Sequence, residues 1–155
     1  MAEAQRKNVI VLNEQQRIID YLLSQLRDKN TNTAQYRFFS ERIMTLLVEE
    51  AISQEIVIDQ TPHYSPTGAE YKHLKLRQPE TKMCAVSILR AGDSMLDPVM
   101  HLLPDITVGK ILIQRNDKAE PVFLYCKLPT DIASAERVLL VDPMLATGGS
   151  ASVAI

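Results

Sequence analysis

The segment 138–150 constrains the fold of this chain more than any other, because it joins a buried strand to a glycine turn. Residues 138–141 are four consecutive apolar residues, the pattern of a buried parallel strand, and Asp142 follows at the strand's carboxyl end. Thr147, two glycines and Ser150 then open a short helical stretch. A strand, a glycine turn and a helix can place a phosphate on free backbone N–H groups. Asp142 can accept hydrogen bonds from sugar hydroxyls nearby, so the segment suits a sugar phosphate.

The commoner phosphate-binding motifs do not fit this segment. A P-loop requires a lysine after its last glycine, and here Ser150 follows Gly149. A dinucleotide fingerprint requires Gly-x-Gly-x-x-Gly after the first strand, and the sequence contains no such run. For Gly-Gly-Ser alone, an ordinary strand-to-helix turn is an equal alternative, because glycine occurs in turns of every kind.

A second polar loop is expected at the same edge of the sheet. Residues 83–89 form another apolar strand, and Arg90, Ala91 and Gly92 follow it directly. A third apolar strand is predicted over residues 108–114. Strands separated by helices indicate an α/β fold with a mostly parallel sheet flanked by helices. Ligands of such sheets bind at the carboxyl ends of the strands, so the two polar loops are expected to converge on one ligand.

The remaining elements are predicted from apolar spacing and turn residues. Helices are expected over residues 13–27, 38–52, 97–103 and 150–155, and additional strands over 55–59, 71–76 and 121–127, with turns at 62–68 and 116–120. The first helix has capping-box spacing between Asn13 and Gln16. The second is expected to bury one face, formed by Phe39, Ile43, Leu46, Leu47 and Ala51. Pro98 is expected in the first turn of its helix, where proline is tolerated.

Composition narrows the classes of partner. The chain has 155 residues, a size typical of one domain, and its net charge of −2 argues against nucleic acid as the main partner. No apolar stretch approaches a membrane span, and the charged N-terminus does not look like a signal peptide. Cys84 and Cys126 are expected as small buried residues in a reducing compartment, so we expect a cytoplasmic protein. The three histidines have no metal-ligand spacing, so no protein-built metal site is expected.

Several segments together resemble one enzyme family. Residues 142–150, Asp-Pro-Met-Leu-Ala-Thr-Gly-Gly-Ser, closely resemble the phosphoribosyl diphosphate (PRPP) signature of phosphoribosyltransferases, and Pro143 in place of a second acid resembles the uracil phosphoribosyltransferases. Residues 87–95 resemble that family's pyrophosphate loop, and 109–115 with 127–129 resemble its flexible arm. Residues 26–31, Arg42 and residues 47–51 resemble the N-terminal helices of its eukaryotic-type members. These matches are colinear and cover nearly the whole chain.

The resemblance implies a type I phosphoribosyltransferase-like fold with a β-hairpin arm, and it assigns the site residues. Arg90 and Asp142 are implied as catalytic. Arg90 has a surface salt bridge as its alternative, and for Arg115 the alternative is an ion pair with Asp117 or Glu120. The residues implied to bind PRPP are Arg90, Ala91, Gly92, Arg115, Asp142, Pro143, Met144, Leu145, Ala146, Thr147, Gly148, Gly149 and Ser150.

The implied reaction is transfer of phosphoribose from PRPP to N1 of uracil, which gives UMP and pyrophosphate. Mg²⁺ would bind mainly through PRPP oxygens and water, because Pro143 replaces the second acid. GTP is implied as an allosteric activator at a site that includes Arg42, although a solvated helix face is the alternative there, since the expected basic partner falls near Thr33. PRPP and uracil are the implied substrates, and a homo-oligomer is expected. The rival hypothesis is a non-catalytic protein of this fold that binds PRPP or a nucleotide as a sensor or partner.

The expected organisation is a single domain over residues 1–155. Its N-terminal helices would occupy residues 1–53 and its PRPP-binding core residues 82–155. Family members continue with further strands and a loop that contacts uracil, so the domain is expected to be incomplete at its C-terminus, with the uracil-binding residues beyond Ile155.

Overall fold

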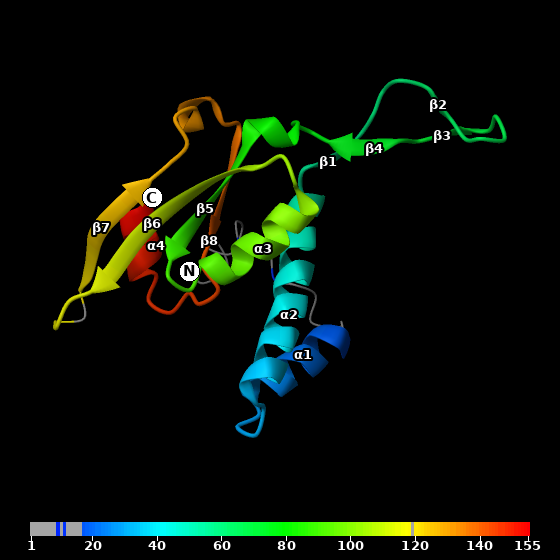
Figure 1. The fold of residues 1–155 in the computed structure, drawn as a ribbon. Coiled ribbons are helices and arrows are strands. Elements are labelled where there is room, and N and C mark those ends of the chain that lie inside the picture. The colour runs from blue at the N-terminus through cyan, green and yellow to red at the C-terminus, as the bar shows by residue number, and fades with distance from the viewer. Residues whose placement is uncertain (1–8, 10, 12–16, 119) are drawn as a thin grey trace, which may run out of the picture.

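The largest sheet has four strands and is mixed, and the N-terminal helices and a β-arm extend away from one side of it (Figure 1). The structure is a computed structural model that describes residues 9, 11, 17–118 and 120–155. The strand order is β7-β6-β5-β8, in which β5 (Met83–Leu89) runs parallel to β6 (Thr107–Arg115) and to β8 (Arg137–Val141). β7 (Pro121–Lys127) returns antiparallel to β6. The predicted α/β fold is confirmed: two of the three strand pairs are parallel, and the antiparallel pair of β6 and β7 makes the sheet mixed.

Helices cover both faces of this sheet. On one face, α2 (Thr33–Ser53) and α3 (Asp93–Leu102) pack on Met83 and Ala85 of β5. On the other face, α4 (Gly149–Ala154) lies over β5 and β6 and adjoins a cluster of buried side chains. This second cluster consists of Cys84, Val86, Ile88, Ile111 and Ile113. Because successive strand residues point to opposite faces, β5 is buried on both sides, and its continuous apolar run follows from this position.

The N-terminal helices form a pair that the sequence predicted only in part. α1 (Arg17–Arg27) contacts α2, Leu22 is fully buried, and the rings of Tyr21 and Phe39 meet edge to face at 6.0 Å. α2 begins at Thr33, five residues before the predicted start, because Asn32 and Gln35 form a capping box there. The capping box predicted at Asn13 and Gln16 lies outside the described residues.

The predicted buried face of α2 is partly wrong. Phe39 is buried as expected, but Leu47 is 42% exposed, and the other buried residues are Val48 and Ile52. The first half of α2 packs on α1 and its last turns pack on α3 and the sheet. Since the two partners approach from different directions, no single stripe along the helix is buried.

A narrow β-arm projects from the domain between α2 and β5 (Figure 1). β1 (Ile56–Ile58) pairs antiparallel with β4 (Leu74–Leu76), and β2 (His63–Tyr64) pairs with β3 (Glu70–Tyr71). The predicted strands 55–59 and 71–76 do pair as antiparallel neighbours, but the second is split into β3 and β4, and β2 lies inside the turn predicted at 62–68. Gly68 closes the distal turn at φ +83°, which glycine adopts without strain.

Two further expectations require correction. α3 begins at Asp93, four residues before the predicted start, so Pro98 lies inside the helix and not in its first turn. Cys84 is buried as expected, whereas Cys126 is exposed on β7, which is one of the two edge strands of this sheet. Among the described helices, none is long and apolar enough to cross a membrane.

Candidate functional site

The loops after β5 and β8 meet at the carboxyl edge of the sheet. Gly92 lies so close to the end of β8 that a Cβ atom added to it would stand 2.5 Å from the Val141 carbonyl oxygen. The same atom would stand 2.6 Å from the Ile88 carbonyl oxygen, so only glycine fits between the two strands. The contact brings Arg90 and Ala91, which are exposed, next to the residue that precedes Asp142. The peptide bond between Leu89 and Arg90 is cis.

The loop between β8 and α4 leaves several backbone donors open. The Asp142 carboxylate accepts the Met144 N–H at 3.2 Å, and the Thr147 hydroxyl accepts the Gly149 N–H at 3.4 Å. Gly148 adopts φ +76°, which turns the chain into α4. Within the described chain, the N–H groups of residues 146–148 have no hydrogen-bond acceptor. Such a run of free N–H groups before a helix suits an anionic group.

The hairpin of β6 and β7 adjoins this loop. Arg115 ends β6 and pairs in register with Pro121, the first residue of β7. A Cβ atom added to Gly149 would lie 3.6 Å from Pro121 Cγ, so the start of α4 lies beside the start of β7. The structure therefore brings the three predicted loops side by side, with Arg115 at the outer end of the group.

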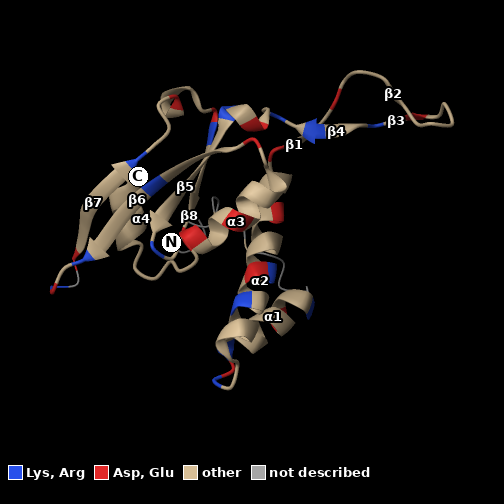
Figure 2. Ribbon diagram, in the orientation of Figure 1, with Lys and Arg blue, Asp and Glu red and all other residues tan. Residues whose placement is uncertain are grey.

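Charged residues of both signs lie at this edge of the sheet (Figure 2). Among the described residues, neither Arg90 nor Arg115 forms an ion pair, and Glu120 accepts instead from Asn116 at 2.9 Å. Within the part of the chain that it describes, the structure therefore does not show the surface salt bridges that were the alternative roles for these two arginines. Two exposed guanidinium groups beside free N–H groups suit a polyanionic ligand.

Cys84 lies on β5, away from this edge, and is not a candidate nucleophile. Burial raises the pKa of the Cys84 thiol above its ordinary value, so the thiol stays protonated near neutral pH. No described group of three or more His, Cys, Asp or Glu residues is arranged to hold a metal ion.

The sequence reasoning missed a polar network directly behind the Arg90–Gly92 loop. The Asp93 carboxylate accepts the Ser87 hydroxyl at 2.9 Å and the Lys110 ammonium at 2.8 Å. Ser87 is fully buried, and Asp93 is the first residue of α3. Ser87 and Lys110 are register partners on β5 and β6, a relation that no local spacing reveals.

Arg42 lies on α2, not at the sheet edge. Its guanidinium stands 5.4 Å from the centre of the Phe38 ring, a cation–π distance. A shallow hollow of about 390 Å³ adjoins it, lined by Phe38, Glu41, Arg42, Thr45 and Leu46.

A second hollow, of about 410 Å³, lies on the α4 side of the sheet and has no polar side chain in its lining. The lining residues are Val86, Ile111, Leu128, Ile132, Val138, Leu140, Ala154 and Ile155. A pyrimidine edge needs hydrogen-bond partners, and none of the side chains that line this hollow can supply one.

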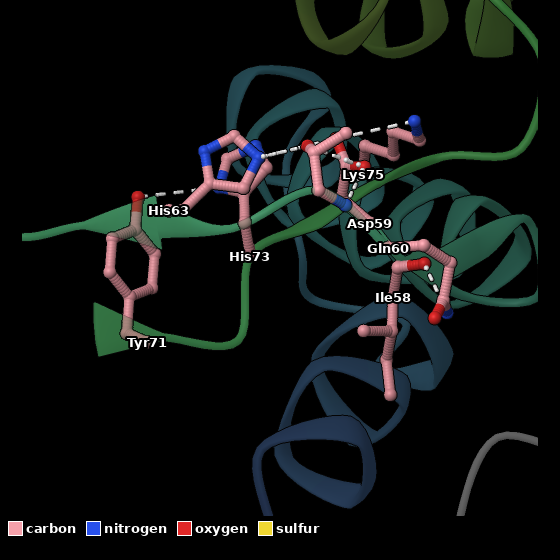
Figure 3. A network of polar contacts seen from close by, with 8 residues as sticks. Ile58, Asp59, Gln60, His63, Tyr71, His73 and Lys75 are labelled. Carbon is pink, nitrogen blue, oxygen red and sulfur yellow. Dashed lines mark hydrogen bonds and ion pairs between the residues drawn. The ribbon is translucent and has the colours of Figure 1, made fainter.

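A second polar network lies on the β-arm (Figure 3). Asp59 accepts the N–H and the hydroxyl of Thr61 at 3.0 and 2.9 Å and also contacts Lys75 at 3.2 Å and His63 at 3.3 Å. These contacts, the Thr61 N–H first, lower the pKa of the Asp59 carboxyl below its ordinary range. The network closes the base of the distal hairpin, and we assign it a structural role.

Comparison with known proteins places these features in one family. A family model described as uracil phosphoribosyltransferase matches residues 12–155. The uracil phosphoribosyltransferase of Dictyostelium discoideum is 41% identical over 150 residues, covering 96% of this chain and 67% of that protein. That of Saccharomyces cerevisiae is 39% identical over 153 residues, covering 96% of this chain and 66% of that protein. The solved structure of the AQ2163 protein from Aquifex aeolicus superimposes with a TM-score of 0.71 at 29% identity, covering 94% of this chain and 67% of that one.

The sheet topology and the loops at its carboxyl edge define a phosphoribosyltransferase-type α/β domain. Within that class, the chain belongs to the uracil phosphoribosyltransferase family. It spans about two thirds of the length of the curated relatives that it matches, from 65% to 67% for the first three.

Proposed function

We propose that this chain is the PRPP-binding part of a uracil phosphoribosyltransferase that converts uracil and PRPP to UMP and pyrophosphate. One observation supports the proposal most. Gly92 touches Val141, and Gly149 lies beside Pro121, so three loops from four strands surround one site. In this proposal residues 1–155 are one domain, with N-terminal helices over 1–53 and the PRPP-binding core over 82–155.

Each part of PRPP has a partner in this arrangement. Residues 146–150 would hold the 5′-phosphate through the free N–H groups of residues 146–148 and the hydroxyls of Thr147 and Ser150, because a helix start suits an anion. Asp142 would accept the ribose hydroxyls through the lone pairs that Met144 N–H leaves open. Pro143, Met144 and Leu145 would form the wall of the ribose site.

Pyrophosphate would lie between Arg90, the backbone of Ala91 and Gly92, and Arg115. As the anomeric C–O bond breaks, negative charge builds on the departing pyrophosphate, and the two guanidinium groups stabilise it. Uracil N1 forms the new bond to the anomeric carbon and gives its proton to the departing pyrophosphate. The developing positive charge on the ribose must be kept from water. No protein nucleophile takes part.

The residues present fit a Mg²⁺ ion that is held mainly by its substrate. Asp142 is the one carboxylate of residues 142–150, Pro143 stands beside it, and Asp93 is already paired with Lys110. Bound to PRPP oxygens and water, Mg²⁺ would supply partial neutralisation of the pyrophosphate charge.

The proposed substrates, assembly, compartment and activator are inferred from membership of the family. PRPP and uracil are the proposed substrates, the proposed assembly is a homo-oligomer, and the proposed compartment is the cytoplasm. GTP is proposed as an activator at the hollow that contains Arg42 and Phe38, where the ring and guanidinium could contact a base and a phosphate. Activity that is unchanged by added GTP would leave Arg42 as part of a solvated helix face.

The test uses the full-length protein and follows pyrophosphate release from PRPP with uracil, cytosine, hypoxanthine or adenine. The proposal expects release with uracil and little with the other bases, because a mismatched edge leaves buried polar groups unpaired. Preferential use of a purine would overturn the choice of base but not the PRPP site. PRPP binding without turnover of any base would favour the rival hypothesis of a sensor.

A further inference from the structure

Three side chains behind the Arg90–Gly92 loop form a closed polar network. Asp93 accepts one hydrogen bond from Ser87 Oγ at 2.9 Å and one from Lys110 Nζ at 2.8 Å, and its two carboxylate oxygens are each used once. We refer to Ser87, Asp93 and Lys110 as the Asp93 network. It joins β5 and α3, which precede and follow the Arg90–Gly92 loop, to the neighbouring strand β6.

The register of the sheet places this network at the level of the proposed PRPP site. Ser87 pairs with Lys110 on one side and with Val141 on the other, and Val141 is the residue before Asp142. Asp93 directly follows Gly92, whose backbone is wedged against Val141. The Asp93 carboxylate is thus the nearest acid in sequence to the backbone proposed to hold pyrophosphate.

The charges of the network have opposite consequences for a pyrophosphate ligand. A carboxylate beside that loop repels the ligand, whereas a carboxylate paired with an ammonium presents no net charge. The side chains of Asp93 and Lys110 are 40% and 44% exposed, so the pair faces the open edge and not the core. Lys127 stands opposite Lys110 in the β6–β7 register, and the ion pair with Asp93 balances the charge of Lys110 beside it.

We propose that the Asp93 network is a positioning device for pyrophosphate binding, in which Lys110 cancels the charge of the carboxylate that anchors the loop. The Ser87–Asp93 hydrogen bond holds the first residue of α3 against the sheet, and that contact fixes the loop geometry. Lys110 makes such an anchor compatible with an anionic ligand. The inference rests on the proposed function, because it assigns pyrophosphate to the Arg90–Gly92 loop.

The test is a double-mutant cycle on the full-length protein, with PRPP affinity measured by calorimetry in the presence of Mg²⁺. Lys110→Met should weaken PRPP binding by roughly tenfold, or about 1.4 kcal/mol, because it leaves Asp93 uncompensated. Asp93→Asn, which keeps an acceptor for Ser87, should bind PRPP no more weakly than the wild type. The double variant Asp93→Asn/Lys110→Met should recover most of the affinity that Lys110→Met loses. Lys72→Met, an exposed lysine on the β-arm, is the matched control and should bind as the wild type does.

The possible results distinguish failure of the proposed role of Lys110 from failure of the proposed PRPP site. A purely structural network would make the double variant at least as weak as Lys110→Met, and that result would overturn the charge role of Lys110. Wild-type affinity in Lys110→Met would overturn it as well. If Lys110→Met does not fold, Lys110→Gln allows the same comparison. Failure of the wild type to bind PRPP would instead overturn the proposed function and the inference with it.

Discussion

Replacing Gly92 with alanine tests whether the two loops are in contact as described. The new Cβ would lie 2.5 Å from the Val141 oxygen, 2.6 Å from the Ile88 oxygen and 2.8 Å from the Ile88 nitrogen. All three are backbone atoms of β5 and β8, so no side chain can rotate away. Gly92 has φ −57° and ψ −27°, which alanine adopts freely, so the whole cost is steric. Relief requires the loop to move away from β8, and overpacking of this kind costs about 1–3 kcal/mol.

Urea unfolding of Gly92→Ala should therefore show a loss of about 1–3 kcal/mol, together with weaker PRPP binding. Gly149→Ala is the matched control for stability, since its Cβ would meet atoms only at 3.5 Å and beyond, an ordinary contact distance. Alanine is also the better residue in α4, so this variant should be as stable as the wild type or more so. A Gly92→Ala protein with wild-type stability would refute the contact between the loops.

Three further changes address single contacts. Arg115→Met should weaken PRPP binding and leave the urea midpoint unchanged, since this guanidinium has no ion-pair partner among the described residues; a shifted midpoint would point to a structural role. Glu55→Gln should destabilise the protein by about 1–3 kcal/mol, because the Glu55 carboxylate accepts a hydrogen bond from Arg137 Nε at 2.9 Å and lies 3.7 Å from Arg77 Nε. An unchanged free energy of unfolding would contradict this. Folding lowers the pKa of Asp59, so its charged form stabilises the fold above pH about 4 and this contribution is lost on acidification. The difference in stability between the wild type and Asp59→Asn should accordingly shrink as the pH falls, and a constant difference would contradict the assignment.

Features with a strong local signal were predictable from the sequence. The unbroken apolar run of β5 required a strand buried on both faces, and the glycine turn after β8 required a strand followed by a helix. The convergence of their loops followed from the geometry of parallel strands. Arg90 and Asp142 could be placed at one edge for the same reason.

Features that depend on tertiary contacts were not predictable. Residues 33–37 are mostly polar and gave no apolar periodicity, so the true start of α2 at its Asn32 cap was missed. Cys126 lies in an apolar run but on an edge strand, and its exposure depends on the strand order. The pairing of Ser87 with Lys110 links residues 23 positions apart, and only the register of β5 and β6 reveals it.

The most direct test of the central claim is calorimetric titration of PRPP into the full-length protein and into its Asp142→Asn variant, with and without Mg²⁺. The account predicts Mg²⁺-dependent binding to the wild type and a loss of about 1.5–3 kcal/mol in the variant, the value of hydrogen bonds to a charged group. Equal PRPP affinity in the two proteins would contradict the ribose role of Asp142 and the site built around it.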